Sequence, residues 1–372
     1  MRRMPSLAPG RMALVTLALA GLACGNVGAE PTATPFAKPT QVPPATPTEA
    51  GVVVESTKTS KPKPTQTSAS QIGFTLADDV FEHSSGAFAI RLPAEWQTEE
   101  FNSSVSATDP TGVSFIEISF VNVGLEFTAE QRLTYAQAVE GNWFATFDLY
   151  EPDAPETFES GTILIFKTLD FEGLPQTVYS YYWQEGPVVY TEDFWVDSDQ
   201  YDAYVDGFGE VSSSTQTDPQ AGAAADLYDL RYEFTAPEEV FAFNIPYGWT
   251  HTTTTEEVAT LDSFNSPDDA TYIESIVYDD GTEISQSLAG EFALTLLKEF
   301  YDVSDVRVSA DEPLEDGREK LTWSSNASSV DGISYFESRG TTFIMLTWIA
   351  DTNSTAFYVP VWEALMDSYY VP

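Results

Sequence analysis

The strongest constraint on the fold of this chain is a nine-residue motif that occurs twice. Residues 88–96 read FAIRLPAEW, and residues 241–249 read FAFNIPYGW, 153 positions later. Matches that continue over a whole unit at nearly one spacing indicate an internal repeat. Further pairs, 154 positions apart, are Gly186 and Gly340, Phe194 and Trp348, and Asp197 and Asp351. We therefore expect two copies of one domain, at residues 71–213 and 228–372, joined by a small-residue linker at 214–227.

Each copy carries the same order of secondary-structure patterns. An entry hairpin and two strands precede a helix, and three strands and a closing helix follow it, as the apolar periodicity predicts. In the first copy the strands are expected at 80–83, 88–92, 104–108, 114–123, 163–171, 177–185 and 188–196. In the second copy they are expected at 232–234, 241–245, 259–265, 271–278, 319–325, 332–339 and 342–349.

Two kinds of helix are expected in each copy. Thr128 and Gln131 have the spacing of a capping box, which predicts a helix start. Apolar residues at helical spacing follow in both copies, which predicts helices packed on a sheet: Leu133, Ala136, Val139 and Trp143, and then Leu288, Phe292, Leu296 and Phe300. The closing helix is clear at 359–369, whereas its counterpart at 201–211 contains glycines.

This layout resembles the Mog/PsbP-like fold. The resemblance rests on the entry motif at 88–96 and 241–249, the central helix, the three-strand meander and the closing helix. It implies an α+β fold with two tandem copies of a mostly antiparallel sheet flanked by helices, an α/β/α sandwich, over 74–213 and 228–372. Members of this family bind unrelated partners, so the resemblance implies no functional residue here.

The first residues have the pattern of an export signal. Three arginines precede the apolar run Met12–Ala23, which is too short to span a bilayer as a helix. Cys24 follows directly, and this arrangement resembles the lipobox of bacterial lipoproteins. The resemblance implies that residues 1–23 are removed and that acylated Cys24 anchors the chain in the membrane of a bacterium, outside the cytoplasm. An ordinary secretory signal with a chance cysteine is the alternative.

Composition separates a tether from the folded part. Residues 24–70 are rich in proline, threonine and serine, so they cannot bury enough apolar surface to order themselves. Residues 71–372 hold 55 of the 58 acids but only 9 of the 16 bases of a chain with net charge −42. Such acidity repels phosphate backbones, so we expect no nucleic-acid partner.

The sequence offers few candidates for catalysis. It contains one cysteine and two histidines, and it lacks nucleophile-elbow, zincin, P-loop and dinucleotide motifs. His83 and His251 do not occupy matching places in the two copies, so we expect structural roles for both. No catalytic residue and no bound cofactor are therefore predicted.

Acidic turns are the candidates for a metal. Asp197 and Asp199, and Asp351 in the second copy, lie just before a closing helix. Carboxylate oxygens are calcium ligands, so a calcium site is one interpretation of these turns. A solvated turn that reverses the chain is the other.

Aromatic residues are the candidates for partner binding. The run Tyr179–Trp183 holds too many aromatic side chains for all of them to be buried, so Tyr181 or Tyr182 is expected to face a partner. Trp96 and Trp249 match between the copies, as do Phe194 and Trp348, which indicates shared core packing rather than a carbohydrate platform.

These observations favour a non-enzymatic, membrane-anchored lipoprotein that binds an unknown protein or solute. A calcium- or carbohydrate-binding adhesion module is the first alternative. An extracellular hydrolase that uses two carboxylates is the second, and it requires one acid in a dry pocket.

Overall fold

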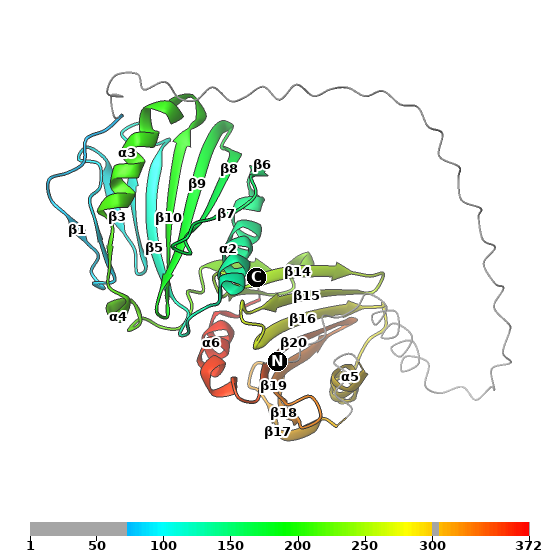
Figure 1. The fold of residues 1–372 in the computed structure, drawn as a ribbon. Helices are drawn as coiled ribbons and strands as arrows, with labels where there is room; N and C mark the ends of the chain where they lie inside the picture. The colour runs from blue at the N-terminus through cyan, green and yellow to red at the C-terminus, as the bar shows by residue number, and fades with distance from the viewer. Residues whose placement is uncertain (1–72, 300–304, 372) are drawn as a thin grey trace, which may run out of the picture.

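The computed structural model describes residues 73–299 and 305–371, and two antiparallel sheets dominate them (Figure 1). The expected signal sequence at 1–23, Cys24 and the expected tether at 24–70 lie outside the described residues. None of the described helices is long and apolar enough to cross a membrane.

The two sheets have the same strand order. The first runs β3-β4-β5-β10-β9-β8-β6, with β7 (Glu156–Thr157) also paired to β8. Its path strands are β3 Gln97–Glu100, β4 Ser104–Thr108, β5 Phe115–Asn122, β10 Val188–Asp197, β9 Leu174–Glu185, β8 Ile163–Phe171 and β6 Asp148–Pro152. The second runs β14-β15-β16-β20-β19-β18-β17. Its strands are β14 Thr250–Thr255, β15 Ala259–Asn265, β16 Thr271–Asp279, β20 Thr342–Asp351, β19 Val330–Arg339, β18 Glu319–Ser325 and β17 Arg307–Pro313. Every pairing within the two sheets is antiparallel.

Each sheet carries one helix on each face. Helix α2 (Ala129–Asn142) and helix α3 (Tyr201–Ser214) pack on opposite faces of the first sheet, and their buried residues belong to different core clusters. Helix α5 (Gln286–Glu299) and helix α6 (Thr355–Ser368) cover the two faces of the second sheet. The capping box of Thr128 and Gln131 is present and starts α2 as predicted.

Entry hairpins complete the two units. In the first, β1 (Phe81–Glu82) pairs with β2 (Phe88–Ile90), which also pairs with β11 (Gln216–Thr217). In the second, β12 (Tyr232–Thr235) pairs with β13 (Ala242–Ile245). Pro93 and Pro246 lie just beyond β2 and β13, where a proline leaves no ladder hydrogen bond unmade.

The interior strands follow the expected ranges, whereas the edge strands were not predicted. Strands β3, β6, β14 and β17 are mostly exposed and lack the apolar alternation that marks a half-buried strand. The helix stripe was wrong at Leu288, which is 50% exposed, and Trp143 is also largely exposed. One side chain in a stripe can lie at the edge of the contact, and a fixed spacing does not show which one.

The predicted linker at 214–227 contains regular secondary structure. It begins with the last residue of α3 and contains β11 and the short helix α4 (Pro219–Gly222). Asn122 Nδ2 donates to the carbonyl oxygens of Ala223 and Ala225, at 3.2 and 2.7 Å. These bonds tie the segment to the first unit, and the amide of Tyr228 donates to the carbonyl oxygen of Asn122 at 2.8 Å, which holds the start of the second unit against β5.

A single apolar cluster joins the two units. It contains Ala136 and Val139 of α2 together with Trp249, Phe243 and Tyr358 of the second unit. Helix α2 thus lies between its own sheet and the second unit (Figure 1). Burial of this size couples the two units, because separating them would expose large aromatic side chains to water.

Candidate binding surface and buried polar clusters

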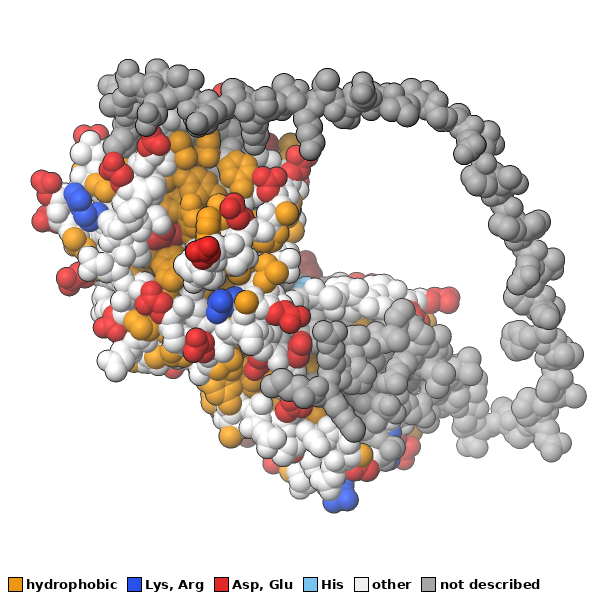
Figure 2. Space-filling model, viewed as in Figure 1, with side chains coloured by type: hydrophobic (Ala, Val, Ile, Leu, Met, Phe, Trp, Pro, Cys, Tyr) orange, Lys and Arg blue, Asp and Glu red, His pale blue; other side chains and the backbone are white. Residues whose placement is uncertain are grey.

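On the face that carries α3, part of the first sheet is left uncovered by the described residues. Four large side chains there are half-buried: Leu164, Phe166, Tyr181 and Trp183, which we call the aromatic face. Residues 164 and 166 alternate with the buried Ile163 and Ile165 on β8, and Leu164 pairs with Tyr181 on β9. Figure 2 shows apolar side chains gathered over β8 and β9 beside α3.

Ring contacts fix these side chains from below. Trp183 stacks on Tyr190 with ring centroids 5.4 Å apart, and Tyr181 lies edge-on to Phe194 at 6.2 Å. Because Tyr190 and Phe194 are fully buried, the aromatic face is held by the core, while its own four side chains stay half-buried.

Exposed carboxylates lie beside the aromatic face, on or next to the elements that carry and flank it. Asp153, Glu156, Glu185 and Asp202 form this acidic rim. Glu156 pairs with Leu164 across β7 and β8, and the amide of Asp153 donates to the carbonyl oxygen of Phe166 at 2.8 Å. The pKa of Tyr181 is raised, first by burial and then by the charges of Glu192, Tyr201 and Glu156.

The expectation for Tyr182 was wrong. Its side chain is 2% exposed, and its hydroxyl donates to Oε1 of Glu140 on α2 at 3.0 Å. Neighbouring strand residues point to opposite faces, so Tyr182 meets α2 whereas Tyr181 lies on the aromatic face.

A charged network that the sequence analysis missed is buried beneath α2. Lys167 is fully buried, and its Nζ donates to Oε1 of Glu140 and to Oγ of Ser180, the latter at 2.7 Å. Ser180 donates in turn to Asp193, and Nζ lies 3.4 Å from the ring centroid of Phe144. Ile163, Ile165, Lys167 and Leu169 are alternate residues of β8, so their side chains point to the same face of the sheet. Because the three apolar residues are buried, this spacing in the sequence indicates that Lys167 is buried too.

The pKa values of Lys167 and Asp193 in this network both depart from their usual values. Burial lowers the pKa of Lys167, against the favourable charges of Glu140 and Asp193. Burial raises the pKa of Asp193 to about 7, although Lys167 and the bond from Ser180 act in the opposite direction. A buried ion pair of this kind fixes the packing of α2 on the sheet and contributes little net stability.

The second sheet holds a neutral counterpart at matching positions. Trp323 Nε1 donates to Oγ of Ser334 at 3.0 Å, and Ser334 lies 3.0 Å from Oγ1 of Thr347. Ser180 pairs with Asp193 just as Ser334 pairs with Thr347. A serine on the middle strand thus links its two neighbours in both sheets, with charged partners in one and uncharged partners in the other.

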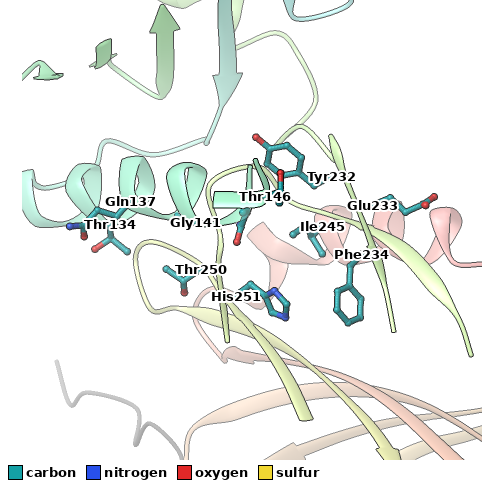
Figure 3. Close-up of a pocket in the computed structure, with 12 residues that line it drawn as sticks. Thr134, Gln137, Gly141, Thr146, Tyr232, Glu233, Phe234, Ile245, Thr250 and His251 are labelled. Atoms are coloured by element: carbon teal, nitrogen blue, oxygen red, sulfur yellow. The ribbon is translucent and has the colours of Figure 1, made fainter. Parts of the chain in front are cut away.

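A cleft of about 380 Å³ lies between the two units (Figure 3). Its lining includes Thr134, Gln137 and Thr146 from the first unit and Tyr232, Thr250 and His251 from the second. His251 Nε2 lies 2.8 Å from Oδ1 of the buried Asp262, and the imidazole stacks on Phe264 at 4.5 Å. The cleft is partly open to solvent, and its lining mixes these polar groups with apolar side chains such as Phe234 and Ile245.

His83 has the structural role that was expected. It is buried, its Nε2 donates to the carbonyl oxygen of Phe101 at 2.9 Å, and its Nδ1 lies 2.7 Å from Oγ of Ser85. His251 on β14 pairs with Phe264 of the next strand. The matching position on β3 of the first unit is Thr98, which pairs with Ala107. The two histidines therefore occupy different places in the two units.

The acidic turns do not gather metal ligands in the described residues. No group of three histidine, cysteine, aspartate or glutamate side chains in 73–299 and 305–371 lies close enough to hold an ion. Asp197 Oδ1 instead accepts the amide of Asp199 at 2.9 Å, which starts the turn before α3. The pKa of Asp351 is raised by burial and by the charge of Asp268.

The matched aromatic residues are core residues. Trp249, Phe194 and Trp348 are at most 1% exposed, and Trp96 is 8% exposed. They are therefore not available as a platform for a sugar ring.

Comparison with known proteins gives only distant similarities. No protein-family model matches the sequence, and no curated protein matches it. The solution structure of cyanobacterial PsbP from Synechocystis is similar over 38% of this chain and 92% of its own, with 11% identity and a TM-score of 0.30. A crystal structure from Bacteroides thetaiotaomicron is similar over 37% of this chain and 48% of its own, with 14% identity and a TM-score of 0.28. The apo structure of the immunity protein TplEi from Pseudomonas aeruginosa is similar over 75% of this chain and 97% of its own, with 12% identity and a TM-score of 0.22.

Proposed function

We propose that this chain is a non-enzymatic lipoprotein, anchored outside the cytoplasm of a bacterium, that presents two tandem PsbP-like domains to a protein partner. The observation that carries the binding role is the aromatic face, a set of large apolar side chains held open on a rigid sheet. Tyrosine and tryptophan on a rigid surface supply much contact area at low entropic cost.

The tandem arrangement is supported by the common strand order and by matched registers. Ile116 pairs with Phe194 in the first sheet as Ile273 pairs with Trp348 in the second. The acylated Cys24 and the proline-rich tether at 24–70 would then hold both units away from the bilayer. At about 3.1 Å per extended residue, such a tether reaches on the order of 100 Å.

Replacement of the candidate anchor tests the localisation. In a bacterial host that processes lipoproteins, the intact chain should fractionate with membranes and incorporate labelled palmitate. Cys24→Ser should remove the label and release a soluble chain of the same fold, with Cys24→Ala as a second variant. If Cys24→Ser stays in the membrane with its first 23 residues attached, the lipoprotein assignment is wrong.

A further inference from the structure

Matching positions in the two sheets differ in the polarity of their side chains. The pairings of β8 with β9 and of β18 with β19 place Leu164 and Phe166 where the second sheet has Lys320 and Thr322. They likewise place Trp183 where the second sheet has Glu337. The first sheet is therefore apolar at sites where the second sheet is polar.

In the second unit these sites are occupied by the unit's own side chains. Glu337 accepts from Arg339 Nε at 2.8 Å and from the hydroxyl of Tyr369 at 3.0 Å, and Tyr369 follows directly after α6. Tyr335, the counterpart of Tyr181, contacts Trp362 of α6 with ring centroids 5.8 Å apart. The closing helix of the second unit thus covers the surface that the first unit leaves open.

The acidic rim beside the aromatic face indicates which charge a partner would carry. All four members of the acidic rim are exposed carboxylates. Anionic membranes carry a negative surface potential, so this face would be repelled from them. Lysine or arginine at the edge of a partner would instead be attracted, while its apolar centre is buried against Leu164 and Trp183.

We propose that the aromatic face docks a segment of another protein that presents apolar side chains flanked by lysine or arginine. This proposal rests on the protein-binding function and adds the site and the chemistry of the partner. The face sits on a sheet that is held from behind by α2 and the buried Lys167 network, so it is preformed, and binding requires little rearrangement.

Synthetic peptides provide the probe. Fluorescent 12-residue peptides of alternating Leu and Lys, Ser and Lys, or Leu and Glu are titrated into the mature chain carrying Cys24→Ser, and binding is read by anisotropy. The Leu–Lys peptide should bind more tightly than either of the others. The double variant Leu164→Thr and Tyr181→Thr should weaken that binding by tenfold or more, since two contact side chains are truncated.

Val308→Thr is the matched control, because Val308 is 41% exposed on β17, an edge strand of the second sheet. It should leave the affinity within twofold, and circular dichroism checks that each variant is folded. Equal binding of the Leu–Lys peptide to the control and the double variant, or equal binding of the Ser–Lys peptide, would overturn the proposal, since either result shows attraction by charge alone.

The chain's own tether is the competing occupant. It contains Val52–Val54 followed by Lys58, Lys61 and Lys63, which is the same chemistry. If deletion of residues 24–72 tightens Leu–Lys binding tenfold or more, the face is occupied within the chain and the proposal of a separate partner is wrong. The fractionation of Cys24→Ser is read independently, so failure of this proposal and failure of the lipid anchor are distinguishable.

Discussion

The ring of Tyr135 on α2 lies directly against Gly248 of the second unit: a Cβ placed on Gly248 would be 2.1 Å from Cε2 of Tyr135. Tyr135 is 1% exposed, and its ring also meets that of Tyr247 at 5.9 Å. One of the two entry motifs identified in the sequence therefore forms part of the contact between the units. Close packing at this point makes the relative position of the units sensitive to a single methyl group.

Gly248→Ala should destabilise the protein for two reasons. The new methyl group collides with Tyr135, and the backbone at Gly248 has a φ of 80°, which favours glycine. Overpacking of this kind costs about 1–3 kcal/mol. Chemical denaturation should show this loss in the free energy of unfolding.

Gly112→Ala isolates the steric part of that effect. Gly112 has a φ of 78°, and nothing lies within 4 Å of an added Cβ. We expect Gly248→Ala to be the more damaging of the two. Equal losses would mean that the contact with Tyr135 has no energetic role.

Lys167→Met should be strongly destabilising, because it leaves Glu140 buried without its cation. Breaking one partner of a buried pair costs about 3–5 kcal/mol, whereas removing both partners is often neutral. The double variant Lys167→Met with Glu140→Gln should therefore recover part of the loss, as measured by urea unfolding.

A partly exposed pair, with the carboxylate side open to water, serves as the comparison for that experiment. Arg318 Nη2 lies 2.6 Å from Oδ2 of Asp316, whose side chain is 50% exposed. Asp316→Asn should cost at most about 1 kcal/mol. If Lys167→Met lowers the free energy of unfolding by as little, the charge of Lys167 is not needed to stabilise the buried Glu140.

Stability should fall as the pH rises through about 7, because burial raises the pKa of Asp193 to about 7. A carboxyl group with a folded pKa above its unfolded value of about 3.9 stabilises the folded state when protonated. That contribution is complete below about pH 4 and is lost through about pH 7. The charged groups that act on Asp193 are Lys167 from β8, Glu117 from β5 and Glu140 from α2. Three tyrosines also interact with it: Tyr182, Tyr232 and Tyr247.

Thermal unfolding between pH 4 and pH 8 in 0.5 M sodium chloride measures this effect while screening the acidic surface. Asp193→Asn should flatten the dependence of Tm on pH. An unchanged slope in this variant would assign the dependence to the other carboxyl groups.

Calcium should raise Tm no more than magnesium at equal concentration, since the described residues gather no cluster of ligands. Both ions should act by screening self-repulsion, and a chelator should have no effect on the purified chain. A calcium-specific rise that Asp197→Asn removes would restore the calcium interpretation of the turns.

The interior of each sheet was predictable because its strands must alternate apolar and polar or run fully apolar. Strands β4, β8, β15 and β18 begin and end at the expected residues. Edge strands such as β14, with the sequence THTTTT, bury little and were missed for that reason. A strand of this type is specified by its neighbour rather than by its own pattern.

The candidate site was predictable only in part. A run of aromatic residues identified β9. The alternation of side chains along a strand puts Tyr181 and Tyr182 on opposite faces of the sheet. Only the positions of α2 and α3 show which of these faces is left partly uncovered. The Lys167 network depends on a helix residue, Glu140, that lies 27 positions away. Long-range pairing of this kind leaves no local signal in the sequence.

Site-specific photo-crosslinking in cells shows whether the aromatic face contacts another protein. A photoreactive amino acid replaces Tyr181 in the full-length chain, and a second variant carries it in place of Tyr335, the matching position that contacts α6. We expect a crosslinked adduct of defined mass from position 181, which disappears when Leu164→Thr is added, and none from position 335. No adduct from position 181, or the same adduct from both positions, would contradict a binding role for the aromatic face.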